Sequence, residues 1–168
     1  MMKIRKKYPF NLGGVPGFVD DFGVVYSADR TVLKYTSYSF CEKYYTVPFG
    51  VRKIESGAFD GSGAVRIRIP SSVEEIGYQA FPMTLSIVIL PESLKEVSPR
   101  VFDFNLSLQK VYVPEMCFER YATMFQNVAH LFVSYNLQTD GKILDNLMRE
   151  SLLGRIVTMF KRRFELHR

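Results

Sequence analysis

Four prolines, each preceded by a short run of alternating apolar residues, recur at intervals of 22, 21 and 23 residues along the middle of the chain. They are Pro48, Pro70, Pro91 and Pro114. Apolar residues also recur three, six and eleven residues after the first three prolines, and the eleventh position is always phenylalanine: Phe59, Phe81 and Phe102. A unit this short cannot bury its own apolar face, so the pattern predicts units that stack on one another as a solenoid.

Each unit is expected to contain one short parallel strand before its proline, because proline cannot donate a hydrogen bond to a strand ladder. The stretch of the form Ile-x-x-x-Ala-Phe that follows is predicted to be a turn of helix or 3₁₀-helix. Its small residue permits close packing, and its phenylalanine fills the interior.

The segments VPFGVRKIESGAF (47–59), IPSSVEEIGYQAF (69–81) and LPESLKEVSPRVF (90–102) resemble the BspA-type leucine-rich repeat, a family named for a bacterial surface protein. The third segment departs from the family pattern at Pro99 and Val101, so we expect that unit to be distorted. The stretch Gly23–Leu33 resembles the β-hairpin that precedes such arrays. The resemblance implies a repeat protein of a kind that is often displayed on cell surfaces and adhesive.

The predicted fold class is therefore an α+β repeat solenoid in one domain over residues 1–168, with short parallel strands stacked as leucine-rich repeats. An N-terminal β-hairpin cap is assigned to 18–43, the repeats to 44–114 and a C-terminal helical segment to 115–168. After Pro114 the apolar spacing becomes helical. The residues on this first helical face are Phe118, Tyr121, Ala122, Phe125, Val128, Ala129 and Phe132.

A second helix is predicted to start near Lys142, after an Asp140-Gly141 turn, and to run to about Glu165. The last twenty residues of the chain, Arg149–Arg168, hold six Lys and Arg against two Glu. Cations are favoured at helix C-termini, and the apolar stripe fits a cap over the open end of the stack. The alternative is a basic amphipathic helix that binds a membrane surface or a partner groove.

The composition argues against catalysis. The chain has two histidines, His130 and His167, with no acidic residue placed to form a catalytic arrangement, and no metal motif. We predict no enzyme activity, no cofactor and no metal site. The net charge of +5 on 168 residues is mild and lies mostly at the two chain ends, so nucleic acid is not expected as a partner. The basic start is not followed by the apolar run of a signal peptide, which favours the cytoplasm, with the cell surface as the alternative that the resemblance implies.

The predicted role is a protein–protein interaction module that binds through the exposed face of its sheet. In each strand the residues two and four before the proline face outward. The candidate partner-binding residues are Tyr44, Arg66, Arg68, Ile87, Ile89, Lys110 and Tyr112, with Thr46 in the same row. Exposed Ile87 and Ile89 between Arg and Tyr would be typical of an interface, unless a terminal segment covers them. The alternative role is self-association or contact with a membrane surface through the basic C-terminal helix; the partner protein stays unidentified.

Overall fold

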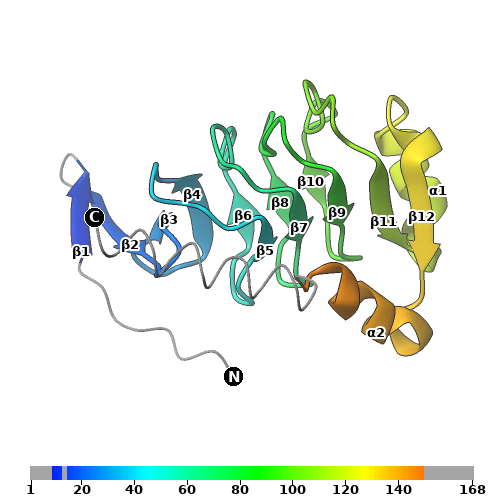
Figure 1. The fold of residues 1–168 in the computed structure, drawn as a ribbon, viewed down its shortest axis with the longest axis horizontal. Coiled ribbons are helices and arrows are strands. Elements are labelled where there is room, and N and C mark those ends of the chain that lie inside the picture. The colour runs from blue at the N-terminus through cyan, green and yellow to red at the C-terminus, as the bar shows by residue number, and fades with distance from the viewer. Residues whose placement is uncertain (1–8, 13–14, 150–168) are drawn as a thin grey trace, which may run out of the picture.

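A computed structural model of the chain describes residues 9–12 and 15–149. Within these residues, two sheets run along the length of an elongated stack of coils (Figure 1), with the shared core between them. The five-stranded sheet has the order β12 (Phe132–Tyr135), β11 (Lys110–Pro114), β9 (Ile87–Ile89), β7 (Arg66–Arg68) and β5 (Tyr44–Thr46). The seven-stranded sheet has the order β1 (Pro9–Leu12), β2 (Val15–Val19), β3 (Val24–Ser27), β4 (Val32–Thr36), β6 (Lys53–Ile54), β8 (Glu75–Ile76) and β10 (Glu96–Val97).

The pairing register of the five-stranded sheet reproduces the spacing of the prolines. Tyr44 pairs with Arg66, Arg66 with Ile87 and Ile87 with Lys110, all in parallel strands. Each unit therefore makes one coil and returns the chain beside the strand of the preceding coil. Tyr45, Ile67, Val88 and Val111 form the inward row of this sheet and are buried. The predicted strands before the prolines are thus present, and they are parallel.

The stretch Ile-x-x-x-Ala-Phe, predicted to be a turn of helix or 3₁₀-helix, forms no helix in the three coils; after its first residue it consists of turns with hydrogen bonds between residues three apart, such as Ala58 N to the Glu55 carbonyl. Residues six after the proline lie instead in the two-residue strands β6, β8 and β10, where Ile54 pairs with Ile76 and Ile76 with Val97. Turns follow these strands. The third unit keeps this pairing in spite of Pro99, and Val101 is fully buried, so the expected distortion does not remove its strand.

A file of aromatic rings forms the centre of the stack. Phe59 stacks on Phe81 with ring centroids 6.5 Å apart, and Phe81 stacks on Phe102 at 5.4 Å. Phe40 and Phe125 extend the file at its two ends with edge-on contacts. We call these five residues the aromatic spine. The aromatic spine makes the core continuous from the N-terminal hairpin to the C-terminal helix. Each coil buries only a few residues of its own, so neighbouring coils share one interior.

The N-terminal end of the stack is closed by a β-hairpin. β3 and β4 pair antiparallel, and β4 then pairs in parallel with β6, with Leu33 opposite Ile54. The hairpin that the resemblance implied around Gly23–Leu33 is therefore present, and the seven-stranded sheet joins it to the first coil. The structure adds β1 and β2, an antiparallel pair that continues the same sheet beyond β3 and that the sequence analysis did not predict.

The C-terminal part differs from the expected pair of long helices. The first apolar stripe is divided among a 3₁₀ turn (Glu115–Cys117), the helix α1 (Phe118–Met124), a second 3₁₀ turn (Ala129–Leu131) and β12. Phe132 therefore lies on a strand, which pairs in parallel with β11. Tyr121 of α1 and Phe125 are fully buried against the last coil. This segment closes the C-terminal end of the stack.

The helix α2 (Leu137–Leu147) starts five residues before the predicted Lys142, so Asp140 and Gly141 lie inside the helix rather than in a turn. Asn136 sets this start: its side-chain oxygen accepts a hydrogen bond from Gln138 N at 3.0 Å. The predicted continuation to Glu165, including nearly all of the basic stretch Arg149–Arg168, lies outside the described residues. α2 does not cover the open end of the stack as expected; it folds back along the five-stranded sheet (Figure 1).

Candidate functional site

The outward face of the five-stranded sheet holds all seven residues predicted to bind a partner. The parallel register sorts them into two rows across β5, β7, β9 and β11. The first row is Tyr44, Arg66, Ile87 and Lys110, and the second is Thr46, Arg68, Ile89 and Tyr112. We call this surface the outward face. The alternation of the strands therefore brings these residues together as predicted.

Helix α2 covers the second row from Arg68 to Tyr112 and leaves Thr46 exposed. Leu144 of α2 packs with Ile89 and Tyr135 in an apolar cluster separate from the main core, and Ile89 is only 2% exposed. The prediction that Ile89 is an exposed apolar residue is therefore wrong. The alternative, in which a C-terminal segment covers it, is the arrangement observed. The physical reason is that the apolar outward residues of β9 and the apolar stripe of α2 are removed from water when they pack on each other.

Two arginines hold α2 on this face. Arg68 forms an ion pair with Asp145, and Arg66 Nη1 donates a hydrogen bond to the Leu147 carbonyl at 2.7 Å. Arg66 also places its guanidinium over the ring of Tyr44, 4.8 Å from the centroid. The arginines predicted to meet a partner are thus engaged by the chain's own helix. Thr46 and Lys110 are exposed, and Tyr44, Ile87 and Tyr112 are half-buried.

A buried network that the sequence analysis missed lies where the hairpin meets the first coil. The hydroxyl groups of Tyr26 and Tyr45 are 2.5 Å apart, and both donate to Asp20 Oδ2 at 3.1 Å. Asp20 Oδ1 accepts hydrogen bonds from the backbone N–H groups of Phe22 and Val24. Burial, and secondarily the neighbouring carboxylate, raises the pKa of Tyr26 far above its ordinary value; burial does the same for the pKa of Tyr45.

One signal could have located this network. Tyr45 is the only tyrosine in an inward row that otherwise holds Ile67, Val88 and Val111, and a buried hydroxyl needs a hydrogen-bonding partner. Asp20 was not singled out, although the Asp20 side chain organises the turn that leads into β3.

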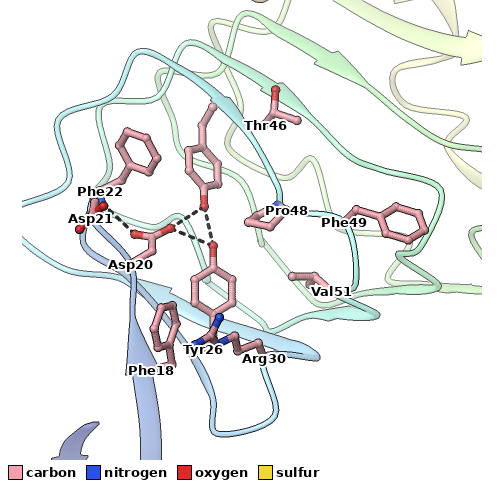
Figure 2. Close-up of a pocket in the computed structure, with 11 residues that line it drawn as sticks. Phe18, Asp20, Asp21, Phe22, Tyr26, Arg30, Thr46, Pro48, Phe49 and Val51 are labelled. Atoms are coloured by element: carbon pink, nitrogen blue, oxygen red, sulfur yellow. Dashed lines mark hydrogen bonds between the residues drawn. The ribbon is translucent and has the colours of Figure 1, made fainter. Parts of the chain in front are cut away.

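Beside this network lies a pocket of about 260 Å³ (Figure 2). Its walls come from the hairpin cap and from the first coil. The residues that line it are Phe18, Asp20, Asp21, Phe22, Tyr26, Arg30, Tyr45, Thr46, Pro48, Phe49 and Val51. Phe49 is largely exposed at its mouth, and the Arg30 guanidinium stacks on the Phe18 ring, 3.8 Å from its centroid. The two carboxylate oxygens of Asp20 already accept four hydrogen bonds from the protein. The rest of the pocket surface is largely apolar.

The phenols of Tyr26 and Tyr45 stay protonated because burial disfavours their charged form, so neither supplies a base. Among the described residues there is no group of three or more His, Cys, Asp or Glu side chains placed to hold a metal ion. In the same part of the chain, neither helix has the length and apolarity to cross a membrane.

Two other buried tyrosines make the stability of the stack sensitive to alkaline pH. Tyr121 donates to the Pro91 carbonyl and Tyr135 to the Leu90 carbonyl, and burial raises the pKa of each to about 12. An unfolded chain ionises these phenols near pH 10, so between about pH 10 and 12 the folded state binds more protons. We expect the free energy of unfolding to fall as pH rises through this window, by about 2 kcal/mol for each tyrosine at pH 12.

Urea unfolding at a series of pH values, with tyrosinate absorbance read in parallel, checks this expectation. The double variant Tyr121→Phe, Tyr135→Phe should be less stable at neutral pH, because two carbonyl groups lose their donors. It should also lose less stability than the parent protein as the pH rises. An unfolding free energy of the parent protein that stays constant from about pH 9 to 12 would contradict the assignment of these buried phenols.

Comparison with known proteins places the repeat in a family. The model of the BspA type leucine-rich repeat region matches residues 30–146 in six copies. Solved structures with a similar fold include the pneumococcal vaccine antigen PcpA, with 20% identity, a TM-score of 0.44, and coverage of 64% of this chain and 33% of that one. A leucine-rich cell surface protein from Faecalibacterium prausnitzii A2-165 has 18% identity, a TM-score of 0.40, and coverage of 75% and 39%.

A leucine-rich repeat protein from Bacteroides capillosus ATCC 29799 is 16% identical, with a TM-score of 0.35, and the match covers 61% of this chain and 96% of that one. The chain spans about a third of the PcpA structure and about two fifths of the F. prausnitzii structure. No curated protein sequence matches it. The family model covers more than half of the chain and includes every coil described above. The chain therefore belongs to the BspA-type leucine-rich repeat family.

Proposed function

We propose that this chain is a non-enzymatic protein-interaction module that binds its partner through the outward face. Leucine-rich repeats commonly serve as interaction or adhesion modules, because stacking coils present a continuous sheet surface on a rigid core. The family membership supports this general role, and the placement of the binding surface rests on the geometry of the outward face.

The observation that carries the proposal is that the outward face already holds a helix. α2 docks there through an apolar contact, Leu144 on Ile89, flanked by the two arginine contacts of Arg66 and Arg68. An apolar centre with arginine and tyrosine around it is the composition of energetically important interface residues. The same face is therefore suited to hold a segment of a partner beside α2.

The area left open by α2 is the first row without Arg66, together with Thr46. Its members combine aromatic, aliphatic and cationic side chains on neighbouring strands: Tyr44, Thr46, Ile87 and Lys110. A partner of complementary surface would carry an apolar patch with an acidic residue opposite Lys110. This role favours the cell surface over the cytoplasm as the place of action, since members of the family are often displayed there.

Site-specific photocrosslinking tests the proposal. A photoreactive amino acid at Lys110, on the outward face, is compared with the same amino acid at Lys95, which is exposed beside β10 in the other sheet. We expect a discrete protein adduct from source-cell extract or intact cells with the Lys110 probe, and at least about tenfold less with the Lys95 probe. Equal labelling from both positions, or labelling from Lys95 alone, would overturn the placement of the interface.

A further inference from the structure

The five-stranded sheet starts one coil later than the sheet on the other side of the stack. β4 pairs with β6 and so continues the seven-stranded sheet beyond the first repeat, whereas β5 is the edge of the five-stranded sheet. The hairpin strand β3 lies in the seven-stranded sheet as well. Among the described residues, no strand fills the position before β5 that a preceding coil would occupy.

The backbone of β5 presents the hydrogen-bonding pattern that a preceding strand would need. Within the stack, the N–H one residue before each proline donates to the following coil: Val47 N to Arg68 O, Ile69 N to Ile89 O and Leu90 N to Tyr112 O. In each later coil, the N–H four residues before the proline donates to a carbonyl group of the preceding coil, as Arg66 N does to Lys43 O and Ile87 N does to Val65 O. By the same rule, the Tyr44 N–H and the Thr46 carbonyl point to the open edge of β5.

The apolar pocket lies at the end of this edge. Tyr45 and Thr46 of β5 line it, together with Pro48 and Phe49 of the loop that follows (Figure 2). In every described coil, the inward residue of one strand lies beside the inward residue of the next. An inward side chain at the end of a strand added to β5 would therefore enter the pocket. Its volume of about 260 Å³ exceeds the roughly 150 Å³ that suffices for a benzene molecule in an apolar cavity.

We propose that the open edge of β5 and this pocket accept an extended segment of a partner protein as an additional parallel strand, with one large apolar side chain in the pocket. Backbone hydrogen bonds along the edge would give affinity, and the pocket would give specificity, as in other cases of strand addition. The inference rests on the proposed interaction role but concerns a different surface from the outward face.

Charge further defines the occupant. The pocket lining holds two carboxylates, Asp20 and the exposed Asp21, against one cation, Arg30. This excess of negative charge favours a Lys or Arg next to the apolar side chain of the occupant. A second copy of the chain paired through its own β5 would not fill the pocket, because its inward residue Tyr45 is already held by Asp20 and Tyr26.

A peptide with the sequence of residues 65–70, acetylated and amidated, is a suitable probe. It is a strand of the stack in its own right, with inward isoleucines, outward arginines and a final proline. Titration into the full chain should give saturable binding, with NMR shift changes at the backbone amides of residues 43–47. A peptide N-methylated at the isoleucine that corresponds to Ile69 removes the N–H expected to donate to Thr46. We expect its affinity to be at least about tenfold weaker, because the methyl group removes the hydrogen bond to the Thr46 carbonyl and also clashes with that carbonyl.

The matched protein variants are Phe49→Ala and Phe104→Ala, since both phenylalanines are largely exposed and only Phe49 lines the pocket. We expect Phe49→Ala to weaken binding of the peptide about tenfold and Phe104→Ala to leave it unchanged. Absence of saturable binding, or binding insensitive to N-methylation and to Phe49→Ala, would overturn the proposal. A dimer formed through β5, detected by sedimentation, would overturn it as well.

Crosslinking from Lys110 does not depend on Phe49, so this proposal and that of the outward face can fail separately.

Discussion

Replacement of Phe81 by alanine is expected to lower the free energy of unfolding by about 3–5 kcal/mol. Phe81 is the middle ring of the aromatic spine and stacks between Phe59 and Phe102. Its removal leaves a cavity that the coils cannot close, because parallel hydrogen bonds in both sheets fix the separation between neighbouring coils. A stack in which each coil contacts only its neighbours should also lose cooperativity at this point.

Urea unfolding followed by circular dichroism measures this loss, with Phe104→Ala as the control. Phe104 is 62% exposed, so its truncation should change stability by no more than about 0.5 kcal/mol. A broad or two-step transition in the Phe81→Ala protein would indicate that the N-terminal and C-terminal coils unfold separately. Equal stability of the two variants would contradict the role of the spine as the shared core.

The repeat was predictable because its signal is periodic. Prolines, inward strand residues and spine phenylalanines each recur about once per coil, and the structure places them in register. The same rule extends one step further than the sequence analysis took it. Phe125 also lies eleven residues after a proline, Pro114, and it packs edge-on against Phe102. A position assigned to a helical stripe was therefore the next ring of the spine.

Elements that carry no period of their own could not be predicted. The two-residue strands β6, β8 and β10 are too short to alternate, and their pairing exists only because neighbouring coils bring them together. The position of Phe132 in the sequence is compatible with both a helical face and a strand, and the residue adopts the strand because it pairs with Val111 of β11. The Asp20 network joins residues of the hairpin to Tyr45, a contact between segments 25 residues apart in the sequence.

The placement of α2 on the outward face leads to the second large effect. Ile89→Asp would put a carboxylate where Leu144 and Tyr135 now pack against the isoleucine. Burial of an unpaired carboxylate costs more than exposure of two aliphatic side chains, so α2 should detach and let the charge reach water. The loss is then limited to the burial of Ile89 and Leu144, about 3–6 kcal/mol in total, because the partly exposed Arg68–Asp145 pair adds little.

Amide hydrogen exchange distinguishes detachment of α2 from a general loss of stability. In Ile89→Asp we expect the amides of α2 to lose protection while those of β7 and β8 keep it. Leu144→Ala should reproduce the loss in α2 without adding a charge, and Ile87→Asp, on the half-buried neighbour in the first row, should leave α2 protected. Deprotection by Ile87→Asp equal to that by Ile89→Asp would mean that α2 does not depend on the second row. If detachment alone also raises crosslinking from Lys110, α2 and the partner compete for the outward face, and α2 then limits the affinity of the module.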